Sequence, residues 1–313
     1  MPLEELEVYQ GRNPRPEDFD EYWARALAEL DGVPEDLAIQ PSGFETRVAD
    51  AFDLTFGGVR GARIYAKLLV PKGAADAPAV VAFHGYSQSS GDWLDLVSWA
   101  SEGFVVAALD VRGQGGRSTD PGGLTGTTFA GQIVRGVSDG PDSLLYRHIY
   151  LDCVRLARIV AALPEVDPTR VSTKGGSQGG GLALACAALE PSIARVAAQY
   201  PFLCDWLRVW ELDLAVGAYD GLRYHLRSFD PRHERKDEFF RTMGYIDVQH
   251  LAPRIHGEVL MATGLMDEIC PPSTQFAAYN KITAPKRMAL YPDFAHEWFP
   301  GWSDMTFDFL RSA

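Results

Sequence analysis

After Pro71, short apolar segments alternate with longer stretches that have the spacing of helices. Short segments that are apolar throughout are typical of strands buried on both faces of a sheet. Strands that alternate with helices form βαβ units, which build a mostly parallel sheet with helices on both faces. The expected strands lie at residues 79–83, 105–109, 170–174, 195–200, 258–263 and 286–291. The sequence therefore predicts an α/β fold.

Helical periodicity is clearest at residues 144–163 and 178–189, and each stretch is followed by a proline that ends it. Residues 14–30 are predicted to form an N-terminal helical extension, because their apolar side chains recur at helical spacing. Residues 48–56 and 62–70 flank a glycine-rich turn and predict a β-hairpin.

Two long stretches interrupt the alternation, at residues 113–142 and 205–250. Each follows a strand, so both are expected to overhang the carboxyl ends of the strands, where open α/β sheets bind ligands. The second stretch is predicted to be a helical, cap-like insertion and not an independent domain. Residues 1–313 are accordingly predicted to form a single domain.

Gly175-Gly176-Ser177-Gln178-Gly179 is a GxSxG motif that directly follows the strand at 170–174 and directly precedes the helix at 178–189. A strand-to-helix turn this tight requires small neighbours and exposes the central side chain above the sheet. In this context the motif is typical of the α/β-hydrolase fold, and Ser177 is the candidate nucleophile.

A serine hydroxyl needs a base to take its proton, and histidine can do this because its ordinary pKa is about 6.5. In this fold the nucleophile is followed by an acid and then by a histidine placed after the last strand. His296 has that position, between the strand at 286–291 and a helix expected at 302–310. The other six histidines precede Ser177, lie within 205–250 or precede the strand at 258–263.

Asp267 lies in the turn after the strand at 258–263, where the acid that orients the histidine is expected. Glu268 and Asp293 are nearby carboxylates, and position in sequence alone leaves them as alternatives. The developing oxyanion needs backbone donors, for which we predict the N–H groups of Gln178 and Tyr86. His84 is interpreted as a polar brace for the loop that carries Tyr86.

The chain has 29 basic and 42 acidic residues, and its net charge of −13 argues against binding to nucleic acid or to anionic membranes. No apolar run approaches the length of a membrane span, and the acidic N-terminus has no secretory pattern, so a cytoplasmic protein is expected. Cysteines at positions 153, 186, 204 and 270 have no metal-ligand spacing. We expect free buried thiols, and neither a metal nor a cofactor.

Several of these motifs together resemble the acetyl xylan esterase and cephalosporin C deacetylase family of carbohydrate esterases. They are GGSQGG at 175–180, HGY at 84–86, RGQGG at 112–116, GLMD at 264–267 and HE at 296–297. NPRPEDFDEYW at 13–23, PFLCDW at 201–206 and CPPST at 270–274 are also similar, so the resemblance spans nearly the whole chain.

The resemblance implies a triad of Ser177, Asp267 and His296 and an oxyanion hole from Tyr86 and Gln178. It also implies removal of acetyl groups from short acetylated xylo-oligosaccharides and cephalosporin C, and assembly as a homohexamer.

The motif of Arg112, Gly113 and Gln114 is implied to be structural, with bidentate bonds from the guanidinium. A preference for a small acyl group requires a tight pocket, and the residues expected to form it are Tyr86, Pro201, Phe202 and Trp206. Alternatives with the same fold are a serine peptidase, a general carboxylesterase and a catalytically silent binding protein.

Overall fold

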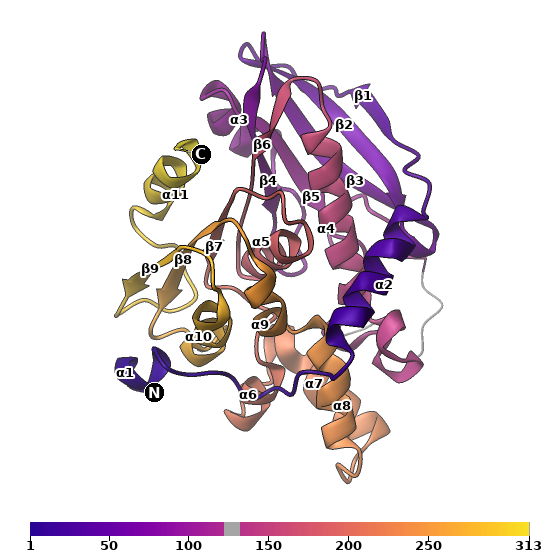
Figure 1. Cartoon of the computed structure of the whole chain (residues 1–313), viewed down its shortest axis with the longest axis vertical. Helices are drawn as coiled ribbons and strands as arrows, with labels where there is room; N and C mark the ends of the chain where they lie inside the picture. The colour runs from indigo at the N-terminus through magenta and orange to yellow at the C-terminus, as the bar shows by residue number, and fades with distance from the viewer. Residues whose placement is uncertain (122–131, 313) are drawn as a thin grey trace.

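A computed structural model describes residues 1–121 and 132–312 (Figure 1). Within them a nine-stranded sheet has the order β1-β2-β3-β5-β4-β6-β7-β8-β9. The strands are β1 (Ala38–Pro41), β2 (Ala49–Gly58), β3 (Ala62–Pro71), β4 (Ala77–Phe83), β5 (Val105–Asp110), β6 (Val166–Gly176), β7 (Arg195–Gln199), β8 (Glu258–Gly264) and β9 (Lys286–Tyr291). The pairs β1–β2, β2–β3 and β3–β5 are antiparallel, and all pairs from β5 to β9 are parallel.

Helices cover both faces of this sheet. The α-helices of the described residues are α1 (Leu3–Leu6), α2 (Phe19–Asp31), α3 (Trp93–Ser101), α4 (Leu145–Ala161), α5 (Gln178–Leu189), α6 (Trp206–Glu211), α7 (Asp220–Phe229), α8 (Lys236–Met243), α9 (Val248–Leu251), α10 (Pro272–Lys281) and α11 (Trp302–Arg311). On one face α4 and α5 pack on the central strands and α2 packs on α4, with α5 near the centre of Figure 1 and α4 and α2 to its right. On the other face lie α3 and α11, on the left. Apolar residues fill both layers, with the larger cluster beneath α4 and α5.

The α/β prediction is confirmed: every predicted strand is present, and the hairpin is β2 and β3. The helices predicted at 144–163 and 178–189 are α4 and α5. The short edge strand β1 and the helices α1, α3 and α10 were not predicted. β1 has mostly exposed residues and so lacks the apolar pattern of a buried strand.

The prediction of a helix from residue 14 was wrong at its start, because α2 begins at Phe19. Pro14 and Pro16 disfavour helical backbone at the residues before them, and the chain has no regular secondary structure between Gly11 and Asp18. There Asp205 accepts hydrogen bonds from the backbone N–H groups of Arg12 and Asn13. The N-terminal arm therefore lies along the segment after β7, past α6 in Figure 1.

Residues 205–250 contain α6, α7, α8 and most of α9, and the first three gather at the bottom of Figure 1. The other long stretch predicted to overhang the sheet is 113–142. Its residues 122–131 lie outside the described residues. The division into one domain with a cap stays a prediction. Among the described helices, none combines the length and apolar character that crossing a membrane requires.

Candidate active site

Ser177 lies at the sharp turn between β6 and α5, with φ 55° and ψ −121°. This left-handed backbone is rare for a residue with a side chain and marks a strained turn. Glycine is required around it, because a Cβ on Gly179 would lie 2.0 Å from the carbonyl oxygen of Phe83. A Cβ on Gly175 would lie 2.3 Å from the carbonyl carbon of Gly179. Close packing against β4 thus fixes the turn that presents the Ser177 hydroxyl.

His296 and Asp267 complete a hydrogen-bonded chain with this hydroxyl. Nε2 of His296 is 3.0 Å from Oγ of Ser177, and Nδ1 is 2.8 Å from Oδ2 of Asp267. An ionised carboxylate only accepts hydrogen bonds, so Nδ1 carries the hydrogen and Nε2 is left to accept one from Ser177. The His296 side chain is 20% exposed, whereas that of Asp267 is fully buried. The imidazole is therefore partly accessible to solvent, while the carboxylate that orients it is shielded.

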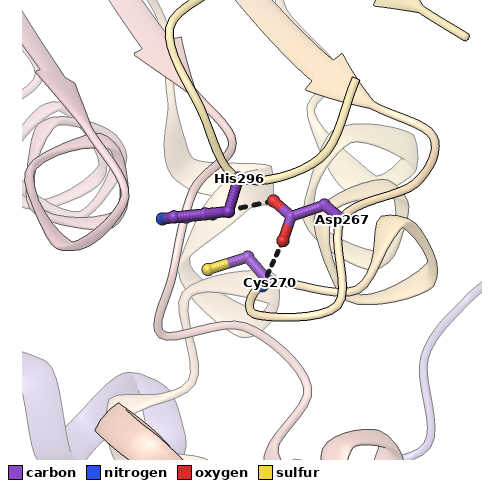
Figure 2. A group of neighbouring side chains, drawn as sticks. All are labelled: Asp267, Cys270 and His296. Atoms are coloured by element: carbon purple, nitrogen blue, oxygen red, sulfur yellow. Dashed lines mark hydrogen bonds and ion pairs between the residues drawn. The ribbon is translucent and has the colours of Figure 1, made fainter. Parts of the chain in front are cut away.

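The loop after β8 holds the Asp267 carboxyl in place. Its Oδ1 accepts hydrogen bonds from the backbone N–H groups of Ile269 and Cys270, each at 2.8 Å. Figure 2 shows the carboxyl between the His296 ring and the backbone of Cys270. The alternatives Glu268 and Asp293 are both exposed, and neither forms an ion pair with His296 within the described part of the chain. The structure therefore selects Asp267 as the carboxylate that contacts the imidazole.

Cys270 brings a thiol close to this pair, and donor atoms of Asp267, Cys270 and His296 lie within 4.8 Å of one another. This spacing could hold a metal ion, but a metal needs the thiolate and a ring nitrogen with a free lone pair. Burial raises the pKa of the Cys270 thiol, and both His296 nitrogens already have hydrogen-bond partners. The donor set fits a proton-transfer chain better than a metal site.

Tyr200 packs against the His296 ring with centroids 4.3 Å apart. Its backbone is also strained, with φ 31°, and its N–H donates to the carbonyl of Ala262. This contact limits the ring orientations open to His296. Nothing in the sequence pattern singled out Tyr200, which simply follows β7.

The side chain of Gln178 forms a buried polar network with the two loops beside it. Its amide exchanges two hydrogen bonds with the amide of Gln114, at 2.7 and 3.0 Å, and its Oε1 accepts a third from Tyr146. Oε1 of Gln114 in turn accepts a bond from the N–H of Ser87, next to Tyr86. The two residues predicted to supply oxyanion donors are therefore joined through Gln114. Sequence reasoning missed this role, although Gln114 belongs to one of the quoted motifs.

His84 braces the same loop, as predicted. Its Nε2 accepts a hydrogen bond from the N–H of Val111, so its Nδ1 carries the hydrogen and donates to the carbonyl of Gly85. Burial lowers the pKa of His84, which keeps the ring neutral in this bracing role.

The four residues predicted to form the acyl pocket differ in exposure. Tyr86 is partly exposed, while Pro201, Phe202 and Trp206 are buried. Phe202 packs edge to face on Tyr86 and on Trp206, with centroids 5.8 and 5.9 Å apart. Tyr219 completes this aromatic cluster from the cap-like segment. Contact of these four residues with a substrate stays a prediction.

Arg112 forms the expected bidentate bonds, but deep in the core. Its Nε and Nη2 each lie 2.6 Å from an oxygen of Asp152 on α4, and Nη1 donates to the carbonyl of Val59. Both side chains are almost fully buried. The pair fastens the loop after β5 to α4, and the following Gly113 has a positive φ of 71° that lets the chain turn toward Gln114.

Ser177 lies on a strand-to-helix turn above a mostly parallel sheet, and it is hydrogen-bonded to a histidine that is in turn hydrogen-bonded to a buried aspartate. This combination defines a hydrolase of the α/β class. The chain is a serine carboxylic ester hydrolase of this class.

Comparison with known proteins narrows the class to a family. The model of the family Acetyl xylan esterase (AXE1) matches residues 1–313. Acetyl xylan esterase 1 from Thermoanaerobacterium sp. JW/SL YS485 is 54% identical, with a TM-score of 0.98 over 100% of this chain and 98% of that chain. For the acetyl xylan esterase from Paenibacillus sp. R4 the identity is 36% and the TM-score 0.94, over 100% and 99% of the two chains. The chain belongs to the acetyl xylan esterase family.

A curated relative agrees with this membership. Acetyl esterase Axe7A of Xylanibacter ruminicola is 30% identical over 298 residues, which are 93% of this chain. The chain spans 65% of the length of that relative.

Proposed function

We propose that the protein removes acetyl groups from short acetylated xylo-oligosaccharides and other small acetyl esters, cephalosporin C included. The observation that carries the proposal is the hydrogen-bonded chain from Ser177 through His296 to Asp267. Family membership supports the acetyl ester as the bond that is cleaved.

The proposed mechanism is acyl transfer in two steps. His296 takes the proton of Ser177 through Nε2 while the hydroxyl attacks the acetyl carbonyl. The same nitrogen returns the proton to the departing sugar alcohol, which leaves an acetyl-enzyme. Water, deprotonated by His296, then releases acetate and restores the serine. Asp267 holds the Nδ1–H tautomer and stabilises the imidazolium, without taking the proton itself.

The negative charge on the carbonyl oxygen needs donors that are fixed in advance. We assign this role to the backbone N–H groups of Gln178 and Tyr86. Gln178 is the first residue of α5, where amides have no partner within the helix and the helix dipole favours an anion. The Gln178–Gln114–Ser87 network supports this assignment, because it holds both amides in one rigid unit. Each such donor contributes about a hundredfold to a thousandfold to turnover.

The acyl specificity follows from the proposed pocket. Phe202 and Trp206 are packed against each other and against Tyr219, so little room is expected for a chain longer than acetyl beside Tyr86. Acetyl esters are therefore expected to react much faster than butyryl esters of the same alcohol.

The test compares 4-nitrophenyl acetate, 4-nitrophenyl butyrate, acetylated xylo-oligosaccharides and a peptide 4-nitroanilide, with Ser177→Ala as the matched control. We expect rapid acetate release, slow release from the butyrate, no amide cleavage and no turnover by the variant. Cleavage of the peptide amide at a comparable rate would favour the peptidase alternative. Equal rates for the acetyl and butyryl esters would favour a general carboxylesterase. If no ester were turned over, the result would favour a catalytically silent binding protein.

We also propose that the protein is cytoplasmic and that it assembles as a homohexamer, the assembly being what the family resemblance implies. Light scattering of the purified protein tests the assembly: six times the 34.4 kDa chain mass is expected, and a monomer mass would contradict it.

A further inference from the structure

A cavity of about 430 Å³ lies between the sheet and the two helices α3 and α11, which are the helices on the left in Figure 1. Trp99 from α3 and Trp302 and Thr306 from α11 form its walls, together with Lys174 of β6 and Gln199 of β7. Gly175 and Gly176 also line it. The cavity is therefore bounded by the backbone that leads directly into Ser177.

Lys174 is the positively charged group at this cavity, and it has no counterion among the described residues. Its Nζ lies 4.5 Å from the centroid of the Trp99 ring, and this cation–π contact holds the ammonium at the wall. Within residues 1–121 and 132–312 no carboxylate lies within ion-pair distance of Nζ, and no hydrogen bond to it is found. Asp95 also lines the cavity, but its carboxylate accepts a bond from the N–H of Asp92 at the start of α3.

Burial lowers the pKa of Lys174 to about 8. Lys174 is only partly exposed, and taking part of an ammonium's hydration away without a counterion costs free energy. The ammonium therefore gains from any anion that enters the cavity beside it.

Two further polar side chains at this cavity lack partners. Nε2 of Gln199 and Oγ1 of Thr306 are buried and have no hydrogen-bond partner among the described residues. Gln199 is 8% exposed and Thr306 4% exposed, so water at the molecular surface does not serve them. Buried polar groups without partners are uncommon in native proteins and call for an explanation. Both groups can donate a hydrogen bond, as Lys174 can.

We propose that this cavity binds a small carboxylate anion, with Lys174 as the charge partner and with Gln199 and Thr306 as hydrogen-bond donors. Three donors and one positive charge match the acceptor atoms of a carboxylate. The indole walls of Trp99 and Trp302 suit an anion that has a small apolar group beside its charge, and so favour acetate or propionate over phosphate. The bound anion lies against Gly175 and Gly176, behind the turn that presents Ser177.

Isothermal titration calorimetry with acetate, propionate, phosphate and chloride tests the proposal on the full chain. The variant is Lys174→Met, and the matched control is Lys72→Met, which removes an exposed lysine after β3. Acetate is also expected to bind weakly at Ser177, but this binding is the same in all three proteins. The difference between them therefore reports the cavity.

We expect acetate and propionate to bind to the parent protein and to Lys72→Met at a site whose affinity falls at least about tenfold in Lys174→Met. Identical titrations for the three proteins would overturn the proposal, and so would phosphate binding as tightly as acetate. Thr306→Val keeps the side-chain shape and removes one donor, so it gives a second measurement should Lys174→Met fail to fold. A weaker acetate affinity in Thr306→Val would support the site as proposed, and an unchanged affinity would overturn it.

Discussion

Replacing Asp267 by asparagine tests the orientation of the catalytic imidazole. Two backbone N–H groups, of Ile269 and Cys270, point at one oxygen of this carboxyl. In Asp267→Asn the side-chain oxygen has to stay on these two donors, so the NH₂ group turns toward His296. That group is a donor, and it favours the imidazole tautomer with its hydrogen on Nε2. A ring in this state faces Ser177 with a hydrogen and cannot accept the hydroxyl proton.

The expected loss follows from this tautomer change. A wrong tautomer with the geometry kept costs about 10⁴ in kcat in a serine protease triad, which is about 5.4 kcal/mol of transition-state stabilisation. We expect a loss of this order in kcat for 4-nitrophenyl acetate, with KM changed little and the thermal midpoint within a few degrees of the parent's. Glu268→Gln and Asp293→Asn change exposed carboxylates of the same loops and serve as matched controls. If Asp267→Asn kept more than a tenth of the parent kcat, or if a control lost as much, the orientation argument would be wrong.

Two other changes test the support of the site and the electrostatics of the fold. Gln114→Leu removes the amide that bonds to Gln178 and to Ser87 N–H, so kcat for acetate release should fall by about tenfold to a hundredfold, part of the effect of losing one oxyanion donor. Gln88→Leu changes an exposed side chain next to Ser87 and should leave kcat unchanged. Equal kcat values in the two variants would contradict the role of the network. Burial and the neighbouring Asp205 raise the pKa of Asp247 from 3.8 to about 7, so the folded state binds more protons there than the unfolded state between these values. The free energy of unfolding therefore falls as pH rises through this window, by up to about 1.4 kcal/mol per pH unit. Denaturant titrations at several pH values should show this fall in the parent protein and in the control Asp237→Asn, which changes an exposed carboxylate, but not in Asp247→Asn.

Much of the fold follows from local pattern. The apolar runs that became β4, β5, β7 and β8 are largely buried on both faces, and such runs are visible in a sequence because burial on both faces leaves no place for polar residues. The edge strand β1 escaped prediction because its exposed residues carry no such pattern. The start of α2 was misplaced because periodicity continued through two prolines that the backbone does not tolerate in a helix.

The sequence by itself determined the turn that carries Ser177 and the order of its partners, because the glycines, the strand before them and the helix after them are adjacent in the chain. Tertiary structure decided which carboxylate meets His296, because the loop after β8 turns Asp267 toward the imidazole and leaves its neighbour Glu268 exposed. It also decided that Gln114, Tyr146 and Gln178 form one network, and that Lys174 lies between two helices without a counterion among the described residues. Such contacts join residues far apart in the chain, and no local pattern encodes the distance between them.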